Sequence, residues 1–267
     1  MKLVYLGTPQ MAVPPLEALV AAGHEVDLVV TNPDRRRGRG GATSPSPVKA
    51  AAERLGLSVA HDVDDVLDVG AELGVVVAFG QLIRPHVLAE LDFVNLHFSL
   101  LPRWRGAAPV ERALLAGDQV TGVCVMALEE GLDTGPVYTR AEVAIGPTTT
   151  ADELRATLVE VGAELLVDTL AQPLATPVPQ EGTPTYARKI TPAELRIDWS
   201  ASAAEIDRLV RLGGAWTTFR GRRVKIHESR LVDGAIEPLV VQPEGKARIA
   251  FDAWRNGAQP SAGEWFE

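Results

Sequence analysis

Two short apolar segments flank a helical one at the start of the chain, and this pattern constrains the fold more than any other feature. Residues 2–6 favour a strand, residues 13–22 have the apolar spacing of a helix ending at Gly23, and residues 25–30 favour a second strand. A strand, a helix and a strand in this order form the crossover unit that joins parallel strands. We therefore expect an α/β fold built on a parallel sheet.

This alternation continues along the chain and then gives way to a different region. We expect helices at residues 48–55, 85–91, 110–116 and 150–174, and strands at residues 73–79, 93–97, 120–128 and 137–145. Residues 175–189 are rich in proline and predict an extended linker. A short helix at residues 206–212 and strand-like alternation at residues 217–232, with a turn at Gly221, follow. We therefore divide the chain into domains at residues 1–185 and 206–267, joined by a linker at residues 186–205.

The composition is that of an ordinary globular protein. Of the 267 residues, 46% are hydrophobic and 23% are charged, which provides for a sizeable core. No stretch approaches the roughly 20 apolar residues of a membrane helix, and the first apolar run is too short for a signal peptide. The single cysteine, Cys124, excludes an internal disulfide and lies in an apolar run typical of the core. We expect a soluble, cytoplasmic protein.

Positive charge is concentrated in two segments of an otherwise acidic chain. The net charge is −9. Residues 31–49, however, contain five cations against one acid, and residues 196–230 contain eight cations against four acids. Each segment thus carries a net charge of +4. Local basic segments are typical of contacts with phosphate groups, although solvated surfaces give the same pattern.

Residues 95–109 (Asn-Leu-His-Phe-Ser-Leu-Leu-Pro-Arg-Trp-Arg-Gly-Ala-Ala-Pro) contain the side chains best suited to catalysis. Asn95 and His97 are two residues apart at the end of a predicted strand, so both point to one face. The following loop has turn formers able to wrap a ligand, and ligands of open α/β sheets lie at the carboxyl ends of strands. We expect a site here, although such a pair also occurs where it only stabilises a turn.

The side chains in and near this segment favour one class of reaction. The Asn95 amide and the His97 imidazole suit an oxygen that becomes negative in a tetrahedral intermediate. Asp133, in a turn bounded by glycines, could orient His97 or relay a proton, although a lone aspartate there is more often a turn residue. No Ser or Cys lies in a nucleophile motif, and the five histidines lack metal-ligand spacing. We therefore expect direct acyl transfer to an external nucleophile, without a metal.

Several motifs in order resemble the methionyl-tRNA formyltransferase family. The matching segments are residues 6–9, 34–40, 45–49, 76–80, 95–109, 131–135, 186–190 and 197–199. The resemblance runs from Met1 to about Val232. It implies an α/β architecture, with a Rossmann-like parallel-sheet formyltransferase domain followed by a small, shortened OB-like β domain.

The resemblance also implies a role for each matching position. Asn95, His97 and Asp133 would be catalytic. The co-substrate N10-formyltetrahydrofolate would lie along two loops, formed by Phe79, Gly80, Gln81, Leu82 and Ile83 and by Ser99, Leu100, Leu101 and Pro102. Initiator methionyl-tRNA would contact Arg35, Arg36, Arg37, Arg39 (a leading contact), Arg220, Arg222, Arg223 and Lys225. The enzyme would be a monomer that formylates the α-amine of the esterified methionine for translation initiation.

The chain departs from the family pattern near its end. Only 64 residues remain from Ala204 onward, so the middle strands of the family's β barrel are expected to be missing, with exposed strand edges as a consequence. Three rival functions remain open. They are formylation of an amino sugar on a nucleotide, formylation of glycinamide ribonucleotide, and catalytically weak binding of RNA or folate. The arginine-rich loop and Trp104 favour tRNA over the first two, and the intact catalytic trio argues against the third.

Overall fold

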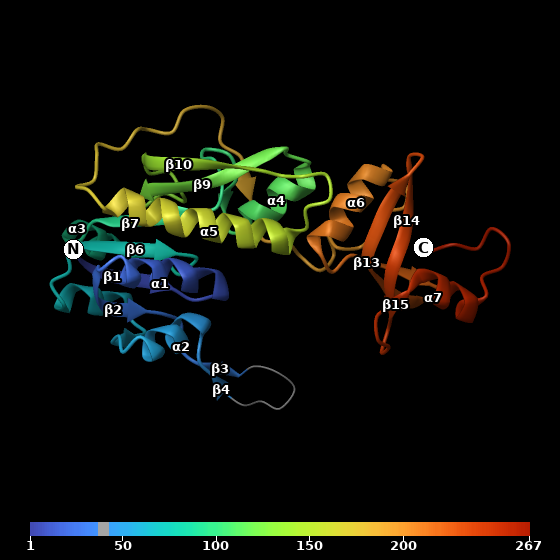
Figure 1. Cartoon of the computed structure of the whole chain (residues 1–267), viewed down its shortest axis with the longest axis horizontal. Coiled ribbons are helices and arrows are strands. Elements are labelled where there is room, and N and C mark those ends of the chain that lie inside the picture. The colour runs from blue at the N-terminus through green and yellow to red at the C-terminus, as the bar shows by residue number, and fades with distance from the viewer. Residues whose placement is uncertain (37–42) are drawn as a thin grey trace. The chain divides into compact units, whose positions relative to one another are not determined.

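A mixed seven-stranded sheet forms the centre of the first part of the chain in the computed structural model, which describes residues 1–36 and 43–267 (Figure 1). The strand order is β10-β9-β7-β6-β1-β2-β5. The strands of this sheet are β1 (Lys2–Gly7), β2 (Glu25–Val30), β5 (Val59–Ala60), β6 (Leu73–Val77), β7 (Phe93–His97), β9 (Val120–Ala127) and β10 (Val137–Ala144). The helices in this part of the chain are α1 (Val13–Ala21), α2 (Pro47–Arg54), α3 (Pro85–Glu90), α4 (Pro109–Ala116) and α5 (Ala151–Leu170), with the 3-10 turns η1 (Gln10–Ala12) and η2 (Val63–Asp68). Two small pairings accompany them, β3 (Arg35–Arg36) with β4 (Thr43–Ser44) and β8 (Arg105–Gly106) with β11 (Tyr186–Ala187).

The parallel part of the sheet confirms the predicted α/β fold. Strands β5, β2, β1, β6 and β7 are parallel, and all five residues of β6 and of β7 are buried, as continuous apolar runs predict. Two strands of this sheet, β9 and β10, depart from the parallel arrangement. Strand β9 runs antiparallel to β7, and β10 pairs antiparallel with β9. The short connection at residues 128–136 can return only as a hairpin, because a parallel crossover needs a dozen or more residues.

Apolar side chains on both faces of the sheet fix its strands. On one face Val4 and Leu6 pack in a cluster with Val66 and Val87. On the other face Gly162 of α5 lies so close to β7 that an added Cβ would be 3.1 Å from Leu96. Because β1, β2, β6 and β7 are parallel, their carboxyl ends lie at one edge of the sheet, where the candidate site lies. The packing on both faces holds these strand ends in place.

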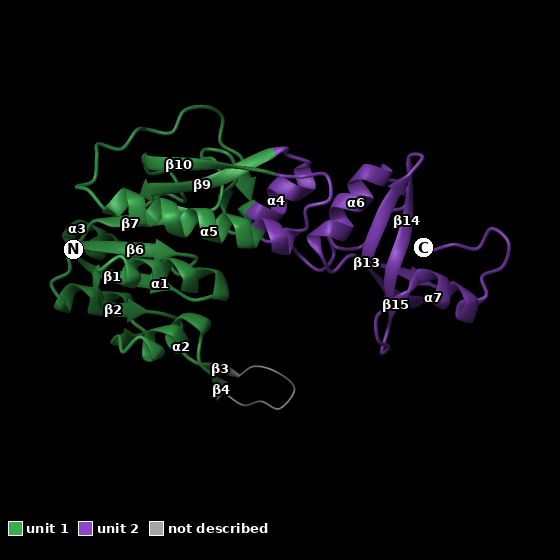
Figure 2. Cartoon of the chain, viewed as in Figure 1, with its two compact units in different colours: residues 1–109, 120–144, 155–187 green, residues 110–119, 145–154, 188–267 purple. Residues whose placement is uncertain are grey.

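The contacts divide the chain into two compact units (Figure 2). Unit 1 comprises residues 1–109, 120–144 and 155–187, and unit 2 comprises residues 110–119, 145–154 and 188–267. Within unit 2, the Arg208 Nε donates a hydrogen bond to the Leu115 carbonyl (3.0 Å) and the Arg211 Nη1 donates one to the Thr149 carbonyl (2.8 Å). Among the described residues, no helix is both long and apolar enough to cross a membrane.

Unit 2 contains a small antiparallel sheet of four strands in sequence order, as expected of a shortened β domain. Its strands are β12 (Trp216–Phe219), β13 (Arg222–Val232), β14 (Ala235–Pro243) and β15 (Ile249–Ala250), and its helices include α6 (Ala203–Leu212) and α7 (Phe251–Ala258). The expectation of exposed edges was wrong on the β12 side. There the Glu267 amide donates to the Thr218 carbonyl (2.8 Å), so the chain's own last residue covers part of this edge.

An aromatic cluster forms the core of unit 2 under this sheet. Its members are Trp199, Phe219, Phe251, Trp254, Trp265 and Phe266. The Phe266 ring is stacked on Trp254 and on Trp199, with centroid distances of 5.0 Å and 5.5 Å. Large aromatic rings bury much area for few residues. The cluster therefore gives a small sheet a core that its apolar strand residues alone would not fill.

The ion pair between Arg220 and Glu264 makes the stability of unit 2 vary with pH in the acidic range. The Arg220 guanidinium donates to both carboxylate oxygens of Glu264 (2.6 Å each), and this hydrogen bonding, with help from the Ser261 amide, lowers the pKa of Glu264 to about 2. Because this pKa is lower in the folded state, the ionised carboxylate stabilises the fold above its unfolded pKa of 4.5. This contribution is lost as the pH falls toward 2. We expect the unfolding free energy of Glu264→Gln to fall less steeply between pH 4.5 and 2 than that of the wild type. Urea denaturation across this range measures it.

The exposed Glu130→Gln serves as the control, and its curve should follow the wild type. Near neutral pH the contribution is fully present in the wild type, so Glu264→Gln should be less stable there by the same amount, which is small because ion pairs at the surface contribute little. Coincident pH dependences of Glu264→Gln and the wild type would rule the contribution out.

Candidate active site

Asn95 and His97 lie at the end of β7, in the interior of the sheet. β7 is paired with β6 on one side and β9 on the other, and His97 is opposite Cys124 in that register. The two residues are 8% and 6% exposed. Because they are two positions apart on one strand, their side chains share a face at its carboxyl end. The structure thus brings this predicted pair together in a fixed place.

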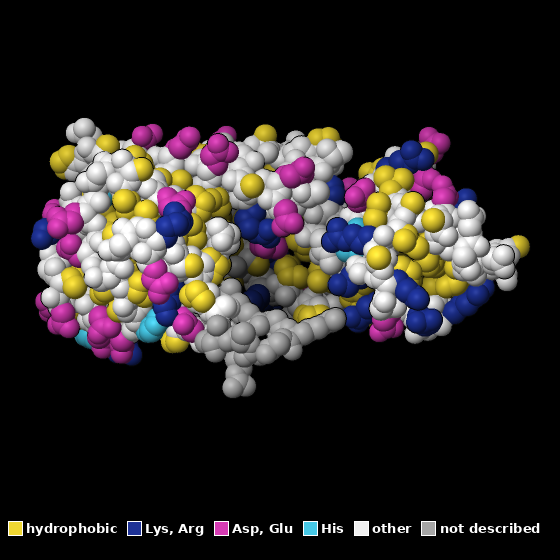
Figure 3. All heavy atoms as spheres, turned by 60° about the horizontal axis from the view of Figure 1, so that its bottom comes forward, with side chains coloured by type: hydrophobic (Ala, Val, Ile, Leu, Met, Phe, Trp, Pro, Cys, Tyr) yellow, Lys and Arg dark blue, Asp and Glu magenta, His cyan; other side chains and the backbone are white. Residues whose placement is uncertain are grey.

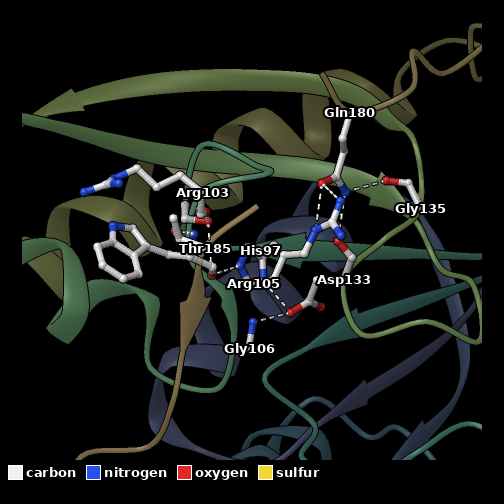
Figure 4. A network of polar contacts seen from close by, with 10 residues as sticks. His97, Arg103, Arg105, Gly106, Asp133, Gly135, Gln180 and Thr185 are labelled. Carbon is white, nitrogen blue, oxygen red and sulfur yellow. Dashed lines mark hydrogen bonds and ion pairs between the residues drawn. The ribbon is translucent and has the colours of Figure 1, made fainter. Parts of the chain in front are cut away.

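Asp133 comes close to the His97 ring from the turn after β9 (Figure 4). The distance from His97 Nδ1 to Asp133 Oδ2 is 3.6 Å, and both side chains are largely buried. On the other side of the ring, His97 Nε2 lies 2.9 Å from the Trp104 carbonyl oxygen. Since a carbonyl only accepts hydrogen bonds, Nε2 carries a hydrogen. The imidazole is therefore held between a backbone carbonyl and a carboxylate.

The turn that carries Asp133 has an unusual backbone. Asp133 itself has a φ of +50°, which aspartate tolerates better than most residues. Gly135 follows so close to β9 that an added Cβ would lie 2.0 Å from the Ala127 carbonyl oxygen. Glycine at this position lets the turn press against the sheet. The Gly106 amide then donates to Asp133 Oδ2 (2.7 Å), which orients the carboxylate.

The loop after β7 is ordered by its own polar contacts. Ser99 donates its hydroxyl to the Arg103 carbonyl (2.5 Å), and the Trp104 amide donates to Thr185 Oγ1 (2.9 Å). Trp104 has a φ of +63°, which is rare for a bulky residue. The Arg103 guanidinium lies 4.4 Å from the centroid of the Trp104 ring. Backbone strain of this kind gathers at functional sites.

The two predicted folate loops follow neighbouring strands at the same edge of the sheet. In the first, Phe79 is buried, Gly80 has a φ of +76°, and Leu82 is 86% exposed. In the second, the structure buries Ser99 and Leu101, and Leu101 packs against Cys124. Leu100 and Pro102 are partly exposed. The exposed Leu82 is thus a large apolar side chain available to a ligand, whereas the Ser99 hydroxyl is used within its own loop.

A short chain of hydrogen bonds holds the first folate loop. Gln81 donates to Asn32 Oδ1 (2.8 Å), Asn32 donates to Thr8 Oγ1 (3.1 Å), and Thr8 donates to the Phe79 carbonyl (3.3 Å). These residues follow β6, β2 and β1. Sequence reasoning missed Thr8 and Asn32 as parts of the site. Their positions directly after two predicted parallel strands could have indicated them.

The residues predicted to contact tRNA differ in their surroundings, and some of them lie outside the described residues. Arg35 is exposed on β3, whereas Arg37, Arg39 and the side chain of Arg36 lie outside the described residues. Arg222, Arg223 and Lys225 are exposed on β13, with the Arg223 guanidinium 3.8 Å from the centroid of the Trp216 ring. Arg220 instead pairs with Glu264. Lys and Arg side chains gather over unit 2, while Asp and Glu predominate on much of the visible face of unit 1 (Figure 3).

The described residues contain no group of three or more His, Cys, Asp or Glu side chains arranged to hold a metal ion. The arrangement that they do contain consists of hydrogen-bond donors and one carboxylate around a histidine. Such a group can stabilise a developing oxyanion and move a proton.

Comparisons with known proteins agree with this arrangement. Residues 1–170 match the formyl transferase family model, and residues 189–238 match the model of the formyl transferase C-terminal domain. A methionyl-tRNA formyltransferase of Roseobacter denitrificans is 44% identical over 304 aligned positions that cover 100% of this chain and 99% of the relative. That alignment exceeds the 267 residues of this chain by 37 positions, as expected of a shortened member. The enzyme of Acidothermus cellulolyticus is 40% identical, and the alignment covers 100% of both chains.

Solved structures share the fold at low sequence identity. Methionyl-tRNA formyltransferase from Clostridium thermocellum matches with a TM-score of 0.63 and 14% identity, over 91% of this chain and 98% of that one. An N-formyltransferase from Helicobacter canadensis, in complex with folinic acid and dTDP-3-aminofucose, matches with a TM-score of 0.68 and 17% identity, over 87% of this chain and 88% of that one. Together with the full-length relatives above, these matches identify the chain as a member of the methionyl-tRNA formyltransferase family.

Proposed function

We propose that this protein transfers the formyl group of N10-formyltetrahydrofolate to the α-amine of methionine esterified to initiator tRNA. The observation that carries the proposal is the grouping of Asn95, His97 and Asp133 at the carboxyl edge of the sheet. It occurs in a chain whose full-length relatives are named methionyl-tRNA formyltransferase. In this proposal residues 1–185 form the catalytic domain and residues 206–267 the tRNA-binding β domain, joined by residues 186–205.

The mechanism is attack by the unprotonated amine on the formyl carbon. A carbon–nitrogen bond forms, the formyl oxygen becomes an oxyanion, and the tetrahedral intermediate collapses with release of the folate nitrogen. Asn95 and His97 donate hydrogen bonds to the oxyanion. Asp133 helps to move a proton from the attacking nitrogen to the leaving nitrogen, directly or through water. Because His97 Nε2 donates to the Trp104 carbonyl in the free protein, its hydrogen must be shared with the oxyanion, or the ring must turn, when substrate is bound.

The test is a formyl-transfer assay with alternative acceptors. We expect transfer to methionyl initiator tRNA and little or none to an amino-sugar nucleotide or to glycinamide ribonucleotide. The amino-sugar acceptor is the main rival, because the Helicobacter neighbour was solved with such a compound. Faster transfer to the amino-sugar nucleotide than to tRNA would reject the proposal.

A variant of the basic loop tests the tRNA contact separately. Replacing Arg35, Arg36, Arg37 and Arg39 with alanine should weaken tRNA binding. The slope of log K against log salt should become shallower by about 0.7–0.9 for each phosphate that the loop no longer neutralises, because fewer counterions are released. Filter binding or fluorescence anisotropy at several salt concentrations measures both effects. Arg140→Ala, an exposed change on β10, is the control. Unchanged salt dependence in the loop variant would exclude the loop as the phosphate contact.

A further inference from the structure

The segment at residues 178–187 runs beside the two loops whose Asp133 carboxylate and Trp104 carbonyl lie against the His97 ring. At one end Val178 exchanges backbone hydrogen bonds with Val137 (2.8 and 2.9 Å), just after the Asp133 turn. At the other end β11 pairs with β8, directly after Trp104. The sequence predicts only an extended linker here. The backbone pairing instead makes the segment part of the wall of the site.

Between these two anchors, the Gln180 side chain joins the two loops directly (Figure 4). Its Nε2 donates to the carbonyl oxygens of Asp133 and Gly135 (2.8 Å each). Its Oε1 accepts from Arg105 Nη2 (2.6 Å) and Nε (3.1 Å). A primary amide has two donor hydrogens and two acceptor lone pairs, so these four bonds use its full capacity.

The two loops that Gln180 joins hold the His97 ring from opposite sides. One supplies the Asp133 carboxylate at Nδ1 and the other supplies the Trp104 carbonyl at Nε2. Asp133 and Trp104 both have positive φ values, +50° and +63°. Such conformations are unfavourable and persist only where surrounding contacts enforce them. The hydrogen bonds from Gln180 to Asp133 and Gly135 enforce one of them.

We propose that Gln180 is a positioning residue for formyl transfer, and that it acts by holding the Asp133 turn at its distance from His97. This inference rests on the proposed function. Gln180 has no contact with the reacting atoms in this role. Its donors hold the turn that carries the Asp133 carboxylate. Its acceptor oxygen ties this turn, through Arg105, to the loop that carries Trp104.

Two variants of Gln180 separate these contributions. Gln180→Met removes donors and acceptor at similar size, whereas Gln180→Glu keeps acceptor oxygens for Arg105 but removes the donors to the turn. We expect both to lower kcat by about 10- to 100-fold, because small displacements of a catalytic group cost this much. The KM values for the folate donor and for tRNA should stay within about twofold. Gln172→Met, an exposed change in the same region of the chain, is the matched control and should behave as wild type.

A second comparison asks whether Gln180 acts through Asp133. In an Asp133→Ala background, adding Gln180→Met should cost less than about twofold in kcat, because the group that it positions is already absent. Hydrogen exchange gives a readout independent of activity. Amides of residues 131–136 should exchange faster in Gln180→Met, while those of β1 and β6 keep their protection.

The outcomes distinguish this inference from the proposed function. If wild-type protein fails to formylate methionyl-tRNA, the proposed function fails, and the exchange experiment still tests the role of Gln180. If the wild type is active, any of four results overturns the inference. These are a kcat of Gln180→Met within about threefold of wild type, near-wild-type kcat in Gln180→Glu, a full additional loss in the Asp133→Ala background, or unchanged exchange at residues 131–136.

Discussion

We expect Asn95→Ala to lower kcat for formyl transfer by about 10²–10³-fold, which corresponds to about 2.7–4 kcal/mol in the barrier. The physical reason is the loss of one preorganised donor to the oxyanion. Asn95 is 8% exposed at the end of a strand paired on both sides, so its amide is held in a low-dielectric place before substrate arrives. A donor that does not have to reorganise stabilises the transition state most. His97→Ala should have an effect of the same size.

Single-turnover formylation of methionyl-tRNA measures this effect on the chemical step. Substrate affinity should change little, because the donor acts mainly on charge that develops in the transition state. Thermal unfolding should show that the fold survives. Asn256→Ala, at an exposed site in α7, should leave kcat unchanged. A wild-type rate in Asn95→Ala or His97→Ala would remove these residues from the mechanism.

The sequence was sufficient to predict where Asn95 and His97 lie, because their position depends on a strand end. An apolar run predicts β7 with its observed bounds, Phe93–His97. The period of two along a strand then places Asn95 and His97 on one face. Such inferences succeed because they depend on local periodicity and on the general rule that parallel strands end at one edge.

Features that depend on pairing between distant segments escaped prediction. Apolar periodicity indicates that β9 exists but not the direction in which it pairs with β7. A separate, local error concerns the helix predicted to reach Leu174, which ends at Leu170, three residues before Pro173. The role of Gln180 depends on carbonyl groups 45 and 47 residues away in the chain. No local pattern marks a side chain whose partners are backbone atoms of another loop.

In unit 2 the sequence contains a turn signal for a strand that was not predicted. Asp233 and Gly234 form the turn between β13 and β14, with φ values of +49° and +78°. Asp-Gly between two strand-like runs is a strong hairpin signal because both positions of such a turn require positive φ. It indicates a strand at residues 235–243, where strands were expected to be missing. The aromatic core beneath that sheet involves residues as distant as Trp199 and Phe266, which no local pattern joins.

Phe266→Ala should destabilise unit 2 by about 3–5 kcal/mol, the usual cost of removing a buried phenylalanine ring. Phe266 lies outside the helices and strands of unit 2, where substitutions usually cost little. Here its ring is only 7% exposed and packs against Trp254 and Trp199, and the next residue pairs with β12. Truncation removes the stacking contacts and leaves a cavity among the other aromatic rings of this core.

Urea denaturation followed by tryptophan fluorescence measures the loss, because Trp199, Trp254 and Trp265 all lie in the affected cluster. Leu231→Ala is the matched control: it removes a large apolar side chain that is 50% exposed on β13 of the same unit, and it should cost far less. A loss below about 1 kcal/mol for Phe266→Ala, against the usual cost of a buried ring, would mean that the ring contributes little to the core of unit 2. The predicted loss would instead show that this small sheet depends on the Phe266 ring for a complete core.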